Sequence, residues 1–176
     1  MESLCFAAEG FSHTGEKIMC EIKENRLYFV KDEFFDKVQD AFLKMNKENT
    51  ARPHYFPFVD DKTGLYWLIP CSSRIDKYKK IIENKMAKGK PHNHIQIIKV
   101  NGREEALLYQ DMFPILPKYI ADPYSNKYGV FEVKSKIMIE KINENAVKII
   151  KLLRHGLRFT PTQPDILRIE KLMIEE

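Results

Sequence analysis

Two adjacent hydroxyl side chains followed by cations form the part of this sequence best suited to chemistry. Ser72 and Ser73 follow the apolar run 66–70, and Arg74 and Lys77 follow the two serines. The apolar run is typical of a buried strand, and the residues after it have the spacing of a helix. Free amides at a helix N-terminus, two hydroxyls and a nearby cation together favour a bound phosphate group. A serine that only caps a helix gives the same pattern, so both interpretations stay open at this point.

A second polar group precedes the neighbouring predicted strand. Arg52 and His54 begin a strand that we expect to pair with the strand ahead of Ser72, which brings a cation and an imidazole toward the serines. An isolated histidine is more often structural than catalytic. Cys71 has no recognisable histidine and carboxylate partner, and we interpret it as a small packing residue.

The sequence predicts neither a metal site nor a cofactor. His92 and His94 have the spacing of a metal pair, but no cysteine or carboxylate lies nearby to complete a site. No P-loop, dinucleotide-binding, zinc-protease or nucleophile-elbow motif is present, nor the dense carboxylate cluster of a two-metal nuclease. A nuclease built on this chain is therefore expected to work without a metal.

The net charge of +4 conceals two basic segments. Residues 1–61 hold eight basic and twelve acidic side chains, whereas residues 71–103 hold nine and two, and residues 134–171 hold nine and four. Clustered cations favour a polyanionic partner. The alternative is that both segments are solvated faces of charged helices, and charge alone does not decide between the two.

Length and composition indicate one globular domain. The chain has 176 residues, of which 44% are hydrophobic and 11% aromatic, enough for a core and too many for a disordered chain. No apolar run approaches the roughly 20 residues of a membrane span. Three cysteines without a C-x-x-C pair argue against a disulfide scaffold and favour the cytoplasm. We expect an N-terminal extension over residues 1–25 and a single domain over residues 26–176.

The hydrophobic pattern predicts an α+β fold. Turn residues at 60–64 and 101–102 predict two hairpins. The predicted strands are 26–30, 54–59, 65–69, 94–100, 105–110 and 130–133. The predicted helices are 32–45, 74–88, 135–155 and a short one that Pro164 opens. We expect Asp32 to cap the first of these helices. Short hairpin-linked strands carrying helices favour a compact antiparallel sheet curled into a small barrel, with a long C-terminal helix.

Three blocks of the sequence resemble the ToxN/AbiQ toxins of type III toxin–antitoxin systems, with the greatest similarity to the CptN branch. Residues 26–37 (RLYFVKDEFFDK) are similar to the opening strand and helix of the family. Residues 52–73 begin with RPHY and end with PCSS, similar to the RP[HY] entry and the PL[ST]S end of its hairpin. Residues 107–115 (LLYQDMFPI) resemble a third family strand. Each motif is short, and their order and spacing over residues 26–155 carry the resemblance.

The resemblance implies an SH3-like barrel of the MazF/Kid type, decorated with helices. It implies a metal-independent endoribonuclease that cuts A-rich mRNA and leaves a 2′,3′-cyclic phosphate and a 5′-hydroxyl. The implied partner is a pseudoknot antitoxin RNA that the toxin excises from its repeated precursor. Toxin and RNA close into a ring (2:2 or 3:3) that masks the active sites. Members of the family restrain growth and can abort phage infection.

The resemblance also implies roles for individual residues. Ser72 and Ser73 match the hydroxyl pair of the family, which we assign to holding the scissile phosphate. Arg52 and His54 match the residues that flank the site, with His54 as an acid or base.

The sequence departs from the family at the catalytic lysine. That lysine usually follows the second hydroxyl by about two residues, where this chain has Ile75. Lys77 is our candidate for its role, reaching back by one helical turn, and Arg74 is the alternative cation.

The candidate surfaces for the antitoxin RNA are then residues 74–103 and the long predicted helix 135–155, with tyrosines to stack on bases. The predicted RNA-binding residues are Arg74, Lys79, Lys80, Lys85, Lys88, Lys90, Tyr78, Tyr109, Lys148, Lys151 and Arg154. Tyr124 and Tyr128 are also available for stacking, and we expect one or two of these tyrosines to do so.

Two other functions are compatible with the sequence. A MazF-like ribonuclease neutralised by a protein would lack tight, salt-dependent binding to an RNA repeat of its own. A non-catalytic RNA-binding or regulatory module would not cleave RNA. A short tandem repeat and a terminator just upstream of the gene are expected for a type III toxin alone.

Overall fold

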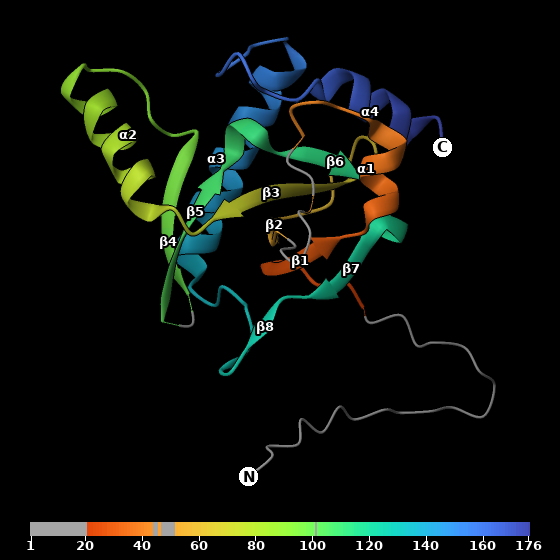
Figure 1. Ribbon diagram of the computed structural model, residues 1–176, viewed down its shortest axis with the longest axis horizontal. Coiled ribbons are helices and arrows are strands. Elements are labelled where there is room, and N and C mark those ends of the chain that lie inside the picture. Colours follow the sequence, from red (N-terminus) through yellow and green to blue (C-terminus); the bar gives the residue numbers. More distant parts are fainter. Residues whose placement is uncertain (1–20, 44–45, 47–51, 101) are drawn as a thin grey trace.

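The structure, a computed structural model, describes residues 21–43, 46, 52–100 and 102–176. Within them the chain has an α+β fold with four α-helices and an antiparallel seven-stranded sheet in the order β4-β5-β3-β2-β1-β7, with β6 paired to β3 (Figure 1). The sheet consists of β1 (Arg26–Val30), β2 (His54–Phe56), β3 (Tyr66–Ser72), β4 (Ile95–Val100), β5 (Arg103–Leu108), β6 (Phe113–Ile115) and β7 (Ile120–Pro123). The helices are α1 (Asp32–Val38), α2 (Ile75–Ala87), α3 (Lys136–Arg154) and α4 (Ile166–Ile174).

Strand β3 is the central element of the sheet. It pairs with β6 along residues 66–68, with β2 at residues 69–70 and with β5 at residues 71–72. Trp67, Leu68 and Ile69 are fully buried. This continuous apolar run is what a strand needs when it is covered on both faces.

Both predicted hairpins are confirmed. In the first, the carbonyl of Asp60 accepts hydrogen bonds from the amides of Thr63 and Gly64, and Gly64 has φ +70°. In the second, β4 and β5 pair without interruption, and Gly102 has φ +74°. Glycine suits both turns because a side chain disfavours this left-handed conformation.

The strands differ from the predictions at several places, and both β3, predicted over 65–69, and β5, predicted over 105–110, have shifted bounds. Strand β2 ends at Phe56 instead of residue 59, and Pro57, which has no amide hydrogen, follows it. The proline-rich segment 113–117 contains β6; the hydrophobic pattern assigned no strand there, whereas the family resemblance placed one within residues 107–115. Strand β7, which pairs with β1, was also missed, whereas the predicted strand 130–133 is reduced to β9 (Gly129–Val130) and an isolated bridge.

The predicted helices 74–88 and 135–155 are confirmed as α2 and α3. Ser135 caps α3, because its hydroxyl accepts a hydrogen bond from the amide of Met138. Helix α4 begins at Ile166 and is capped by Asp165. Figure 1 shows α2 beside the β4–β5 hairpin, α1 and α4 at the opposite end of the molecule, and α3 between them.

Helix α1 is shorter than predicted. It ends at Val38, because Gln39 adopts the left-handed conformation with φ +46°. Asp32 is the first helical residue and not the cap. Its carboxylate instead accepts a hydrogen bond from the side chain of Asn46 at 2.9 Å. Met45, the last predicted helical position, lies outside the described residues.

Residues 22 and 25, just before the predicted domain start at residue 26, contact the rest of the fold. The amide of Asn25 donates to the carbonyl of Phe56, and the amide of Val133 donates to the carbonyl of Asn25. Ile22 packs against the main core. The rest of the predicted extension, residues 1–20, lies outside the described residues. In the described part of the chain, no helix is long and apolar enough to cross a membrane.

Arg154 ties three distant parts of the fold together. Its guanidinium donates to Glu170 of α4 and to Asp60 of the β2–β3 turn, and it lies 5.6 Å from the ring centroid of Trp67. Burial alone would raise the pKa of Asp60, but hydrogen bonds from Arg154 and Thr63 hold it below its usual value. The carboxylate form of Asp60 therefore stabilises the folded state.

Replacing Arg154 with methionine should lower the free energy of unfolding by about 2–3 kcal/mol at pH 7, because Asp60 and Glu170 lose the partner of two partly buried charges. Urea denaturation measures this. The control Lys148→Met removes an exposed ion pair with Glu144 and should cost less than about 0.5 kcal/mol.

The contribution of the Arg154–Asp60 pair should depend on pH with a definite sign. The folded-state pKa of Asp60 is lowered, so its stabilisation is complete above the unfolded value of 3.8 and is lost as the pH falls through the lower folded value. The difference in the free energy of unfolding between wild type and Arg154→Met should therefore shrink below about pH 4. An equal difference at pH 7 and pH 2 would contradict this account.

Candidate active site

The junction between β3 and α2 places the two serines at the surface. Ser72 is the last residue of β3 and lies opposite Ala106 of β5. The chain then turns, since the amide of Ile75 donates to the carbonyl of Ser73, and the amide of Arg74 donates to the hydroxyl of Ser72 at 3.4 Å. Ser73 and Arg74 are exposed, and Ser72 is half-buried.

Helix α2 is held against the β4–β5 hairpin by its own small core. Tyr78 packs there with Ile95, Ala106 and Leu108. This contact fixes the start of α2 relative to β5, and with it the amides of its first turn. Lys77, one turn into α2, is exposed, and its ammonium lies 5.6 Å from the ring centroid of Tyr78.

Arg52 is anchored beside the serines. Its Nη1 donates to the carbonyl of Cys71 at 3.0 Å, one residue before Ser72. Its amide donates to the side-chain oxygen of Asn46, whose amide group in turn donates to the carbonyl of Val30. These contacts place a partly buried guanidinium near the serine pair, as the sequence predicted. The role of Asn46 was missed, because nothing in its sequence surroundings signals it.

His54 lies inside the core. It is fully buried, and its ring centroid lies 5.3 Å from that of Phe113. Burial lowers the pKa of His54 to about 3, and the positive charge of Arg52 lowers it further. Hydrogen bonds with the backbone of Arg52 and Tyr28 raise the pKa, but by less. A buried imidazole that stays neutral does not fit the acid or base role implied by the resemblance.

Cys71 is also a core residue. It is buried, and its Sγ lies 3.7 Å from the carbonyl oxygen of Ile69. Burial raises the pKa of its thiol, and the nearby Glu105 raises it further. A thiol in this environment is a poor nucleophile, which agrees with its interpretation as a packing residue.

Most predicted RNA-binding cations are exposed, but they are not all free. Lys79 is paired with Glu104 at 2.9 Å and Lys148 with Glu144 at 3.8 Å. Lys85 is half-buried, and its Nζ lies 2.8 Å from Nε2 of His94. The exposed members of the predicted set are Arg74, Lys79, Lys80, Lys88, Lys90, Lys148 and Lys151.

Three predicted RNA-binding residues are unsuited to that role. Tyr109 is fully buried, with its hydroxyl bonded to the side chain of Gln96, and Tyr78 is only 8% exposed. Neither ring can stack on a base without leaving the core. Arg154 is neutralised by Asp60 and Glu170. The apolar helical stripe that contains Tyr78 already indicated its burial.

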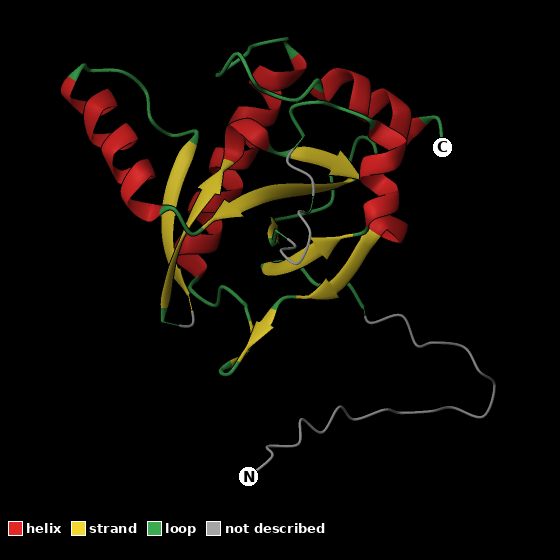
Figure 2. Ribbon diagram, in the orientation of Figure 1, coloured by secondary structure: helices red, strands yellow, loops and turns green. Residues whose placement is uncertain are grey.

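Tyr128 is an exposed tyrosine, whereas Tyr124, the other residue considered for stacking, is half-buried. Tyr128 lies at the turn between β8 (Ser125–Asn126) and β9, in the small hairpin at the lower edge of Figure 2, and is 67% exposed. The ammonium of Lys127 lies 5.0 Å from its ring centroid. An exposed aromatic ring beside a cation suits stacking on a nucleobase.

Of the two histidines at 92 and 94, His94 has a structural role. His94 is buried and stacks on Phe159 at 5.5 Å. Burial lowers the pKa of His94 to about 4, and the charges of Lys85 and His92 act in the same direction. No group of three or more potential metal-ligating side chains occurs within the residues that the structure describes.

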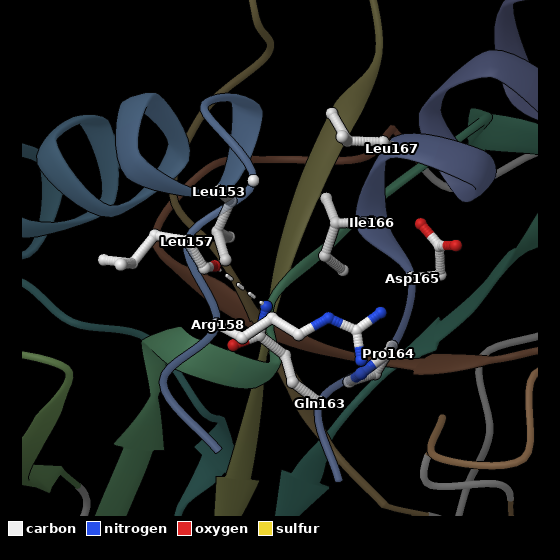
Figure 3. Close-up of a pocket in the computed structure, with 9 residues that line it drawn as sticks. Leu153, Leu157, Arg158, Gln163, Pro164, Asp165, Ile166 and Leu167 are labelled. Atoms are coloured by element: carbon white, nitrogen blue, oxygen red, sulfur yellow. Dashed lines mark hydrogen bonds between the residues drawn. The ribbon is translucent and has the colours of Figure 1, made fainter. Parts of the chain in front are cut away.

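A pocket of about 230 Å³ lies elsewhere, where α3 leads into α4. In Figure 3, Arg158 crosses its opening toward Pro164, and Nε2 of Gln163 bonds to the carbonyl of Leu157. None of the predicted catalytic residues lines this pocket.

Comparison with known proteins identifies the fold class. No protein-family model matches the sequence, and no curated protein matches it. Among solved structures, the chain is similar to one described as AbiQ, a lactococcal anti-phage endoribonuclease belonging to the type III toxin–antitoxin system. The TM-score is 0.64, over 83% of this chain and 93% of AbiQ, with 14% sequence identity. The protein therefore has an AbiQ-like fold.

We expect His54 to remain neutral in the folded protein down to about pH 4, because burial lowers its pKa to about 3. The NMR signals of its ring should not move between pH 7 and pH 5, whereas they should titrate in the urea-unfolded chain. A transition of the folded-state signal near pH 6.5 would refute the buried assignment.

The same shift makes a prediction about stability. The unfolded chain binds a proton at His54 below about pH 6.5, so the folded state loses about 1.4 kcal/mol per pH unit from this residue between about pH 6 and pH 4. His54→Phe, which does not titrate, should flatten the slope of stability against pH by that amount. Chemical denaturation across this pH range measures it.

Proposed function

We propose that this protein is a metal-independent endoribonuclease, the toxin of a type III toxin–antitoxin system. The observation that carries the proposal is the β3–α2 junction, where Ser72 and Ser73 meet a helix N-terminus beside the anchored guanidinium of Arg52. Its position in an AbiQ-like fold supports the proposal further. We also assign the fold to the SH3-like barrels of the MazF/Kid type, and the chain to the CptN branch and to the cytoplasm.

The proposed reaction is attack of a ribose 2′-oxygen on the adjacent phosphorus. The bond from phosphorus to the 5′-oxygen breaks, which leaves a 2′,3′-cyclic phosphate and a 5′-hydroxyl. Ser72, Ser73 and the first amides of α2 hold the phosphate oxygens, and Arg52 stabilises the negative charge that grows on them. Lys77 donates a proton to the leaving 5′-oxygen. Arg74, which is exposed at the same junction, is the alternative cation.

The proposed partners are A-rich mRNA and a repeat-derived pseudoknot RNA that the toxin excises from its precursor. The exposed cations of α2 and α3 supply phosphate contacts, and Tyr128 replaces Tyr78 and Tyr109 as the stacking residue. Antitoxin RNA and toxin are proposed to close into a ring (2:2 or 3:3) that covers the active sites, and release of the toxin restrains growth during phage infection.

Expression of variants in a bacterial host tests the proposal. Wild type should arrest growth and create new 5′-hydroxyl RNA ends within A-rich mRNA, whereas Ser73→Ala and Lys77→Ala should lower cleavage by about 10²–10³-fold. Lys171→Ala, at an exposed position of α4, is the matched control and should behave like wild type.

The possible results separate the three candidate functions. Cleavage retained in Lys77→Ala would move the cationic role to Arg74. If wild type is folded but creates no new 5′-hydroxyl RNA ends, both ribonuclease hypotheses are excluded and an RNA-binding module is favoured. Cleavage that no RNA from the upstream repeat inhibits would favour a ribonuclease neutralised by a protein.

Loss of the exposed ring should weaken RNA binding. Tyr128→Ala should raise the Kd for single-stranded RNA by about 5–100-fold, because stacking of one base contributes about 1–3 kcal/mol. Tyr128→Phe keeps the ring and should bind like wild type. Fluorescence anisotropy at a fixed salt concentration measures both. Equal affinities of wild type and Tyr128→Ala would remove Tyr128 from the interface.

A further inference from the structure

Arg52 lies at a point where the sheet no longer fixes the backbone. Strand β2 begins at His54, and Pro53, which has no amide hydrogen to donate, separates it from Arg52. The pairing of β1 with β2 ends at Tyr28 and His54. The guanidinium of Arg52 is nevertheless held one residue before the serine pair, where its Nη1 donates to the carbonyl of Cys71 at 3.0 Å. Another contact must therefore set the backbone from which this side chain extends.

The side chain of Asn46 supplies this contact. Continued by two residues, the register of β1 and β2 would set Val30 opposite Arg52. The carbonyl of Val30 accepts a hydrogen bond from Nδ2 of Asn46 at 2.9 Å, and the amide of Arg52 donates to Oδ1 of the same side chain at 3.3 Å. The side-chain amide of Asn46 thus bridges the two backbones as a peptide group of a neighbouring strand would.

A third hydrogen bond fixes the orientation of this side-chain amide. Nδ2 of Asn46 also donates to the carboxylate of Asp32 at 2.9 Å, so its nitrogen and its oxygen both have partners. A carboxylate in place of the amide would turn an oxygen toward the carbonyl of Val30 and toward Asp32. The arrangement therefore requires an amide, which joins the end of β1 and the start of α1 to Arg52.

We propose that Asn46 is a positioning residue of the active site, which sets the backbone of Arg52 so that its guanidinium reaches the scissile phosphate. This inference rests on the proposed function. Asn46 touches no reacting atom and acts through Arg52 alone. A guanidinium held in advance stabilises the charge that grows on the phosphate oxygens, whereas a loose side chain must first be ordered. Loss of Asn46 should therefore slow the chemical step and leave the affinity for RNA nearly unchanged.

Single-turnover cleavage by purified full-length variants tests the inference, with an oligoribonucleotide that carries the site mapped for wild type. Asn46→Ala should lower the rate constant of cleavage by about 10–10²-fold. It should leave the Kd nearly unchanged for the same oligonucleotide with a 2′-deoxyribose at the cut site, which cannot be cleaved.

Tyr55→Phe is the matched control, because it removes a hydrogen bond of 3.0 Å from β2 to the side chain of Asn25. It should lower the thermal midpoint about as much as Asn46→Ala does, by about 2–4 °C, and should cleave like wild type.

A double-mutant cycle with Arg52→Ala separates positioning from stabilisation. In the Arg52→Ala background, Asn46→Ala should lower cleavage by less than about twofold further, because no guanidinium remains to be positioned, while its effect on the thermal midpoint should persist. Losses that multiply in the double variant overturn the role of Asn46 and leave the ribonuclease proposal intact. Cleavage by folded Asn46→Ala at the rate of wild type does the same. Absence of cleavage by wild type overturns both.

A second variant covers the case in which Asn46→Ala does not fold. Asp32 is exposed, and Asp32→Ala removes one hydrogen bond of Asn46 while it keeps those to Val30 and Arg52. It should lower cleavage by about two- to fivefold when Arg52 is present and leave it unchanged in Arg52→Ala. No loss when Arg52 is present, or equal losses in both backgrounds, overturns the inference.

Discussion

The candidate active site depends on the pairing of β3 with several neighbours. One strand pairs with β6, β2 and β5 along its length, so its end is fixed in position by the whole sheet. Ser72 and Ser73 stand at this end, where the hydrogen-bonded ladder stops and the first turn of α2 begins. A phosphate site built in this way needs little reorganisation when its ligand arrives.

The polar groups around β3 divide into buried and accessible ones. His54 and Cys71 share the neighbourhood of Arg52, but they face the core, and burial holds the imidazole and the thiol in their neutral forms. Arg52 keeps part of its side chain accessible and bonds to the carbonyl ahead of Ser72. Proximity in sequence thus brings these residues together, and the direction of each side chain decides whether it is buried or accessible.

The cations also divide into those bound within the fold and those that are accessible. Arg154 belongs to a basic segment, yet it forms ion pairs with Asp60 and Glu170 from two other parts of the chain. These ion pairs join α3 to α4 and to the first hairpin. The lysines on the outer face of α2 have fewer constraints, which suits contacts with a flexible polyanion. A basic segment in a sequence therefore contains cations that are paired within the fold as well as exposed ones.

Short-range patterns were sufficient to predict the two hairpins, the helices α2 and α3, and the strand-to-helix junction at Ser72 and Ser73, because turn residues and periodicity act over a few neighbouring positions. They failed for β6 and β7, whose pairing depends on distant partners. They also failed to show that His54 and Tyr109 are buried and that Arg154 is paired. Burial, charge pairing and cross-strand register arise between residues far apart in the chain, so tertiary structure alone decides them.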